Sequence, residues 1–227
     1  MLEAILFDHD GTLVDSEKVH FKLLSEVVRK YGICLTYEEY RENYEGIPLP
    51  ATATKLVSHY DLDIAPDVIV SQKKQATTHY LSEQAFPLMS GAKDAITYFH
   101  SLGLRLAVVT GAARDEGVYN TLKNHSLDKY ISVVVSADDV ERSKPAPDCY
   151  SLAMNKLNVS AENCVAIEDT LNGSLSAVAA GIACIGVSSA ITQSEPFQGN
   201  VVAQFTNLED ARSWLQRNHL SSKRSDG

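Results

Sequence analysis

The chain has 227 residues, which is enough for one large domain or for a core domain with a smaller insert. Its formal net charge of −9 makes it a poor candidate for binding nucleic acid or an anionic membrane surface. No apolar run approaches the ~20 residues of a membrane span, and no signal-peptide pattern is visible near residue 1. We therefore expect a cytoplasmic protein with no nucleic-acid or membrane partner, and a monomer, since nothing in the sequence demands an oligomer.

Short apolar runs rich in β-branched residues recur along the chain and alternate with stretches of helical character. They lie at 4–7, 104–109, 132–136, 164–167, 183–187 and 200–205. Continuous apolar strands of this kind are typical of a parallel sheet covered on both faces by helices. The alternation predicts an α/β fold with a Rossmann-like, doubly wound parallel sheet.

The interval from 16 to 85 contains helical patterns but no strand-like run. Thr36 and Glu39 form a capping box in the segment TYEEY, and Pro66 suits the first turn of a further long helix. This interval predicts an all-helical insert placed after the first strand. The expected units are an α/β core made of 1–15 and 86–227, and an insert made of 16–85.

The four cysteines form no CxxC pair, and no Cys/His spacing resembles a zinc site. We expect buried free thiols in a reducing compartment. They are Cys34, Cys149, Cys164 and Cys184.

Four of the strand-like runs lead into unusual polar groups. These groups are Asp8-His9-Asp10, Thr110-Gly111, Lys144, and Glu168-Asp169. In an open parallel sheet, ligands bind outside the carboxyl ends of the strands. The four groups are therefore expected to converge on one site, although they lie far apart in the chain.

The carboxylates in this expected site need a compensating positive charge. Like charges at contact distance repel by about 4 kcal/mol per pair at an intermediate dielectric. The available ligands are hard oxygens without a His/Cys set, which favours Mg²⁺ or Ca²⁺. Lys144 adds a positive charge, and Thr110 with the amides of Gly111 and Ala112 offers an anion cradle. A carboxylate nucleophile in such a setting suits phosphoryl transfer through an aspartyl-phosphate.

The complete pattern resembles the four-motif set of the haloacid dehalogenase superfamily. It reads DxDGTLxD from Asp8, then Thr110-Gly111, then Lys144-Pro145, then Glu168-Asp169. The resemblance covers almost the whole chain, and the helical insert matches the cap domain of members capped between the first two motifs. It implies a hydrolase with Mg²⁺ as cofactor and a small phosphorylated metabolite as substrate.

The resemblance also implies a role for each motif residue. Asp8 is the nucleophile, and Asp10 is the general acid and then the general base. Thr110 and the following amides hold the phosphoryl oxygens, while Lys144 screens charge and positions Asp8. The implied Mg²⁺ ligands are Asp8, Asp10 through its backbone carbonyl, and Asp169, with Glu168 nearby.

Two histidines need separate interpretation. If Asp8 and Asp10 face the site, alternation along the backbone turns His9 away, so we expect a packed or hydrogen-bonded histidine. His20 lies on the first insert helix, and we expect it at the substrate. The other substrate-binding candidates are Gly111, Ala112, Glu45 and Arg114.

The branches of the superfamily differ in residues that can be checked. Its dehalogenases lack the second aspartate, so Asp10 argues against that branch. Its phosphonate-cleaving members use a cap lysine, and we expect Lys73 and Lys74 to be solvated instead. A β-phosphoglucomutase-like mutase needs a cation for a second phosphate, and the matching stretch YEGIPLP contains none.

Simple hydrolysis of a small phosphomonoester, such as a sugar or polyol phosphate, is therefore the expected reaction. The mutase remains an alternative. A non-catalytic regulator that binds phosphate or Mg²⁺ is an alternative of another class, although the intact acidic and basic motif residues argue against it.

Overall fold

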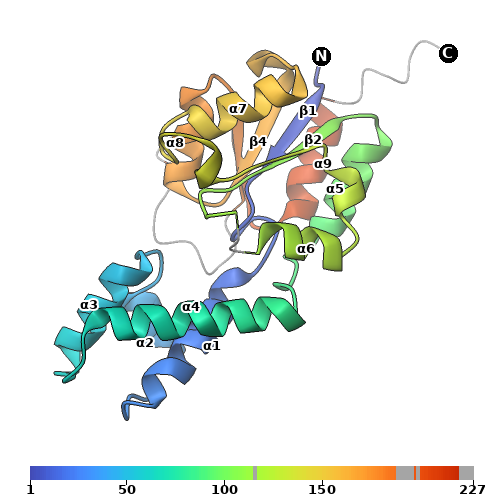
Figure 1. Ribbon diagram of the computed structural model, residues 1–227. Helices are drawn as coiled ribbons and strands as arrows, with labels where there is room; N and C mark the ends of the chain where they lie inside the picture. The colour runs from blue at the N-terminus through green and yellow to red at the C-terminus, as the bar shows by residue number, and fades with distance from the viewer. Residues whose placement is uncertain (115–116, 188–196, 198–199, 220–227) are drawn as a thin grey trace. The chain divides into compact units, whose positions relative to one another are not determined.

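The computed structural model describes residues 1–114, 117–187, 197 and 200–219, and the chain divides into two compact units (Figure 1). One unit combines Met1–Asp15 with Pro87–Gly227, and the other is Ser16–Phe86. Phe86, which we expected in the first unit, belongs to the helical unit. Its ring packs there against Tyr80 and His20, with centroid distances of 6.0 Å and 5.3 Å.

The first unit is built on a parallel sheet. Its strands are β1 (Ala4–Phe7), β2 (Arg105–Val109), β3 (Val133–Val135), β4 (Cys164–Glu168), β5 (Ala183–Val187) and β6 (Ala203–Phe205). Every neighbouring pair is parallel, and the order is β3-β2-β1-β4-β5-β6. This order is that of a doubly wound sheet, so the predicted fold class is confirmed.

Helices cover both faces of the sheet. Those of the first unit are α5 (Ala92–Ser101), α6 (Val118–Asn124), α7 (Asp148–Leu157), α8 (Leu171–Ala179) and α9 (Leu208–His219). Figure 1 shows α7 and α8 on one face and α5 and α9 on the other. Three short 3₁₀ turns are η1 (Asp128–Tyr130), η2 (Ala137–Asp139) and η3 (Ala161–Asn163). Because both faces are covered, β1 and β4 are buried along their whole length.

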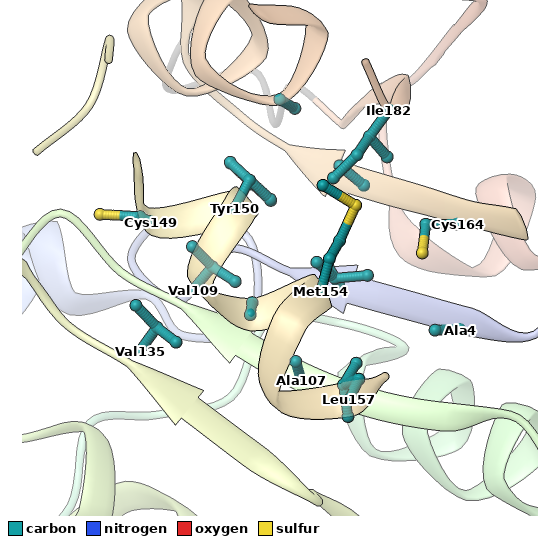
Figure 2. Packing of buried hydrophobic residues seen from close by; sticks show 14 of the residues in the cluster. Ala4, Ala107, Val109, Val135, Cys149, Tyr150, Met154, Leu157, Cys164 and Ile182 are labelled. Carbon is teal, nitrogen blue, oxygen red and sulfur yellow. The ribbon is translucent and has the colours of Figure 1, made fainter. Parts of the chain in front are cut away.

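Side chains of β1 point alternately to the two layers. Phe7 meets Phe99 of α5, with ring centroids 6.2 Å apart. Leu6 points to the other face, where it belongs to a buried cluster with residues of α7. Figure 2 shows this cluster, in which Tyr150 and Met154 of α7 pack over β1 and β2.

The second unit is all-helical, with a core of its own. Its helices are α1 (Ser16–Arg29), α2 (Tyr37–Asn43), α3 (Leu49–His59) and α4 (Pro66–Glu83). Thr36 caps α2 as predicted, because its Oγ1 accepts the Glu39 N–H at 3.2 Å. Pro66 is the first residue of α4, also as predicted. The core of the unit includes Leu24, Val28, Tyr44, Leu56 and Ile69.

Two further sequence expectations concern membrane-spanning helices and the cysteines. Within the described residues, no helix combines the length and apolar character needed to cross a membrane. All four cysteines are free, and Cys149, Cys164 and Cys184 are buried. Cys34 is exposed, so the expectation of burial was wrong there. It lies in the short connection between α1 and α2, outside the core of the helical unit.

Leu6→Ala should strongly destabilise the first unit, because Leu6 is fully buried on the central strand. A deletion of this size in a packed core costs about 2 to 5 kcal/mol. Urea unfolding measures the change in the free energy of unfolding. Val178→Ala on the exposed side of α8 is the control and should change it by no more than about 0.5 kcal/mol. Equal effects of the two substitutions would contradict the assignment of Leu6 to the core.

Candidate active site

The motif residues meet at the carboxyl ends of β1, β2 and β4. The strand order reverses between β1 and β4, which is where doubly wound sheets bind their ligands. Asp8 directly follows β1, and Asp169 directly follows Glu168, the last residue of β4. Asp8, Glu168 and Asp169 each offer a carboxylate oxygen, and these oxygens lie within 4.8 Å of one another.

Lys144 lies at the centre of this cluster. Its Nζ donates to Asp8 Oδ1 at 2.6 Å, to Glu168 Oε1 at 2.7 Å and to the Val109 carbonyl oxygen at 2.8 Å. An ammonium has three N–H donors, so all of them are used. Only 8% of the Lys144 side chain is exposed. One buried lysine therefore links the ends of three neighbouring strands.

Burial and charge shift the pKa values of these groups. Burial alone would lower the pKa of Lys144, but Asp8 and Glu168 more than offset it, so the pKa lies above its usual value. Burial and the neighbouring Glu168 raise the pKa of Asp8 from 3.8 to about 7, although Lys144 opposes the shift. Burial and Asp8 raise the pKa of Asp169 well above its usual value. A single lysine thus leaves this cluster short of positive charge.

The buried carboxylates fit a hard divalent cation. Among the described residues, no hydrogen-bond donor reaches Asp8 Oδ2, Glu168 Oε2 or Asp169 Oδ1, and all three atoms are buried. Buried carboxylate oxygens without partners are costly unless a cation binds them. The donor set is oxygen only, which suits Mg²⁺ or Ca²⁺ rather than zinc.

Asp10 and His9 differ in their surroundings. The Asp10 side chain is 36% exposed, whereas that of Asp8 is 9% exposed. His9 is buried as expected, and its Nδ1 lies 3.2 Å from Asp10 Oδ2. It is thus the packed and hydrogen-bonded histidine that we expected, and the edge of its ring meets the Asp10 carboxylate.

The loop after β2 contacts Asp10. Thr110 Oγ1 lies 3.5 Å from Asp10 Oδ2 and accepts the Ala112 N–H at 3.0 Å. The Ala112 amide, which we assigned to an anion cradle, is thus bound inside its own loop. The cradle role of Gly111 and Ala112 stays a prediction.

Two carboxylates of η2 hold the end of the same loop. The Arg114 N–H donates to Asp138 Oδ2 at 2.7 Å, and the Arg114 guanidinium pairs with Asp139. Asp139 also accepts the Ser136 N–H and hydroxyl, each at 2.8 Å. Arg114 is therefore engaged inside the first unit, and its contact with substrate stays a prediction.

The model of the haloacid dehalogenase-like hydrolase family matches residues 5–187. The chain belongs to this family. It is 33% identical over 206 residues to protein CbbY of Cereibacter sphaeroides, covering 88% of this chain and 90% of that protein. It is 30% identical over 186 residues to a phosphorylated carbohydrates phosphatase of Thermotoga maritima, covering 80% and 82%.

The crystal structure of a putative beta-phosphoglucomutase from Thermotoga maritima has the same fold. It matches with a TM-score of 0.83 and 26% identity, and covers 96% of this chain and 100% of that chain. The resemblance predicted from the four motifs is therefore confirmed at the level of the haloacid dehalogenase-like family.

In this haloacid dehalogenase-like hydrolase, the helical unit contains the remaining residues that the sequence analysis considered for substrate binding or catalysis. Lys73 Nζ lies 2.8 Å from His20 Nδ1, so the expectation that Lys73 is solvated was wrong. Because an ammonium can only donate, Nδ1 accepts, which places the proton of a neutral His20 ring on Nε2. Lys74 is exposed, as expected.

Glu45 is the other candidate of the helical unit. Its Oε2 lies 3.7 Å from Arg41 Nε, while no described residue donates to its buried Oε1. Burial and the nearby Glu17 raise the pKa of Glu45. The substrate contacts assigned to His20 and Glu45 stay predictions.

Two glycines make room for the carboxylates, and sequence reasoning did not single them out for this. A Cβ on Gly173 would lie 1.9 Å from Glu168 Oε2, and one on Gly11 would lie 2.0 Å from Asp169 Oδ2. The signal for Gly173 was available, since an isolated glycine in a helical pattern often marks a close approach. Its partner is 5 residues away in sequence but can be identified only in the folded chain.

Gly173→Ala should displace the Glu168 carboxylate and lower turnover at least tenfold, which is roughly the effect of disturbing a metal site's supporting residues. Helix propensity alone predicts the opposite, since alanine favours a helix over glycine by about 1 kcal/mol. Steady-state kinetics with a phosphomonoester measures the loss. Asn172→Ala, on the exposed side of the same turn, should keep wild-type turnover. Wild-type kcat in Gly173→Ala would contradict the close contact.

Proposed function

We propose that this chain is a Mg²⁺-dependent phosphatase that hydrolyses a small sugar or polyol phosphate through an aspartyl-phosphate on Asp8. The observation that carries the proposal is the different hydrogen bonding of the two Asp8 carboxylate oxygens. Lys144 fixes one of its oxygens, while no described hydrogen-bond donor reaches the other. A carboxylate that is oriented on one side and open on the other suits a nucleophile or metal ligand.

The first half of the proposed reaction transfers the phosphoryl group to Asp8. A carboxylate oxygen of Asp8 attacks phosphorus while the bond from phosphorus to the ester oxygen breaks. The leaving alkoxide takes a proton from the Asp10 carboxyl group. Asp10 suits this role because it is the more exposed aspartate of the pair.

The second half releases phosphate. A water molecule attacks phosphorus, and the bond between phosphorus and Asp8 breaks. Asp10, now a carboxylate, takes the proton of the attacking water. Lys144 remains paired with Asp8 throughout, and Thr110 with nearby amides would hold the phosphoryl oxygens.

The cation would be held by Asp8, Asp169 and the Asp10 backbone carbonyl, with Glu168 nearby. When bound, Mg²⁺ supplies charge compensation for the carboxylates and for the phosphoryl oxygens. The three buried and unpartnered carboxylate oxygens support this assignment. The oxygen-only donor set agrees with it.

The proposed substrate class rests on the relatives. One relative is named as a phosphatase of phosphorylated carbohydrates, and a structural neighbour is titled a putative beta-phosphoglucomutase. A mutase must hold a phosphate at both ends of its intermediate. The stretch 44–50 has no Lys or Arg, and nearby Lys55 donates to the Asn43 carbonyl oxygen at 2.7 Å. Hydrolysis is therefore the proposed outcome.

A panel of sugar and polyol monophosphates, with p-nitrophenyl phosphate as a generic substrate, tests the reaction. Release of inorganic phosphate with Mg²⁺, and its loss with EDTA, is the expected result. A phosphorylated isomer as product would instead identify a mutase. Binding of a phosphate analogue without any turnover would identify a regulator.

Asp8→Asn should lower kcat by more than about a thousandfold, because the amide cannot act as the nucleophile. The substitution keeps the side-chain size and an oxygen for Lys144, so the fold should persist, as circular dichroism can check. Asp128→Asn on exposed η1 is the matched control and should keep wild-type turnover. Substantial turnover in Asp8→Asn would contradict the assignment of the nucleophile.

Mg²⁺ should bind more weakly as the pH falls below about 7. Without the cation, the raised pKa means that Asp8 holds its proton more tightly in the folded protein than in the unfolded chain. Proton binding therefore stabilises the fold, fully below about pH 4, and this stabilisation is lost as the pH rises to about 7. A cation needs the ionised carboxylates, so its binding releases protons. The gain in melting temperature from a fixed Mg²⁺ concentration should therefore be larger at about pH 8 than at about pH 5.

Asp169→Asn is the control for that experiment, because it removes one proposed ligand. Its Mg²⁺-dependent gain should be small at both pH values. An equal gain at both pH values in the wild-type protein would contradict a site built from carboxylates of raised pKa.

A further inference from the structure

Tyr150 lies beside the site but belongs to none of its motifs. It is on α7, fully buried, in the cluster that packs against the sheet (Figure 2). Its hydroxyl lies 2.6 Å from Glu168 Oε1. The same ring lies under Lys144, whose Nζ is 5.3 Å from the ring centroid. A single side chain thus contacts both the cation and the carboxylate at the centre of the site.

The hydroxyl of Tyr150 acts as a donor. An ionised carboxylate can only accept hydrogen bonds, so the phenol O–H donates to Glu168 Oε1 across the 2.6 Å that separates the two oxygens. Glu168 Oε1 therefore accepts two bonds, one from Tyr150 and one from Lys144 at 2.7 Å. Among the described residues, none donates to Glu168 Oε2. Both protein donors thus reach one oxygen of Glu168, and the other stays available to a cation or its water.

The contact with the ring adds a second constraint. All three donors of Lys144 are bound, and the ring covers a further direction around the ammonium. A cation over the face of a buried aromatic ring is attracted to it and shielded from water. The ring should therefore keep its own contact with Lys144 when the hydroxyl is removed, so any change at Lys144 in such a variant comes through Glu168.

We propose that Tyr150 is a positioning residue that orients Glu168 through its hydroxyl and thereby sets the geometry of Lys144 and of the cation site. The loss of turnover expected when the hydroxyl is removed rests on the proposed function. The expected effect on the geometry of Lys144 does not, because it needs neither metal nor substrate.

The competing explanation is that Tyr150 only fills space in the core. Tyr150→Phe separates the two, because it keeps the ring, its packing and its contact with Lys144 while removing the hydroxyl. A space-filling residue predicts wild-type kcat and wild-type Mg²⁺ affinity in this variant. A positioning residue predicts a loss of roughly tenfold to a hundredfold in Mg²⁺ affinity and kcat, the usual range for groups that orient metal ligands. KM should change far less than kcat.

The experiment compares the wild-type protein, Tyr150→Phe and Tyr60→Phe. Tyr60 is a matched control, because its hydroxyl also donates to a glutamate, Glu39, but within the helical unit. Calorimetric titration with MgCl₂ in the absence of substrate gives the metal affinity, and steady-state kinetics gives kcat and KM. Tyr60→Phe should leave the Mg²⁺ affinity unchanged.

A third measurement is independent of metal and substrate. Lys144 should react slowly with an amine-acetylating reagent in the wild-type protein and faster in Tyr150→Phe, relative to exposed Lys129, as mass spectrometry can follow. If the wild-type protein binds no Mg²⁺, the proposed function fails by itself, and this labelling decides the role of Tyr150. Unchanged Lys144 labelling would then overturn the proposal.

A double-mutant cycle with Glu168→Gln completes the test. If Tyr150 acts through Glu168, the two substitutions share one interaction, so their effects on Mg²⁺ affinity should not add. Additive effects, or wild-type kcat and Mg²⁺ affinity in Tyr150→Phe, would overturn the proposal. A Tyr150→Phe protein that fails to fold would also overturn it, since packing would then be the main role.

Discussion

The ammonium of Lys144 is paired with Asp8 and Glu168 at a buried place, where burial raises the pKa of Asp8 and Lys144 opposes that shift. The rest of the site follows from this pairing. Three strands must end at the same level for Lys144 to reach Asp8, Val109 and Glu168 together, and the parallel register of the sheet provides this. One positive charge does not balance three buried carboxylates, so the arrangement calls for a cation. The proposed chemistry uses the same imbalance, since a phosphoryl group brings more negative charge to the same place.

Much of this arrangement could be predicted from the sequence, because it depends on local patterns. Apolar β-branched runs marked the strands, and the rule that ligands bind at the carboxyl ends of parallel strands placed Asp8, Thr110 and Asp169 in one region. The predicted bounds of the last strand were less accurate. The run at 200–205 forms a strand only over Ala203–Phe205, at the edge of the sheet.

The remaining features depend on tertiary contacts that no local pattern encodes. Alternation along the backbone suggested that His9 turns away, but the sequence did not indicate its contact with Asp10, whose Oδ2 lies 3.2 Å from His9 Nδ1. Lys73 looked like an exposed helical lysine, but the packing of the helical unit brings it to His20. Gly173 and Tyr150 gain their importance only through Glu168, since one makes room for its carboxylate and the other donates to it. Such supporting residues are the least predictable part of a site built on predictable motifs.

The stereochemical course at phosphorus tests the central claim, that Asp8 takes the phosphoryl group before water does. A substrate with an isotopically chiral phosphoryl group, hydrolysed in isotopically labelled water, reports how many displacements occur. Each in-line displacement inverts the configuration at phosphorus. Attack by Asp8 followed by attack of water therefore predicts overall retention. Overall inversion would show a single direct attack by water and would contradict an aspartyl-phosphate on Asp8.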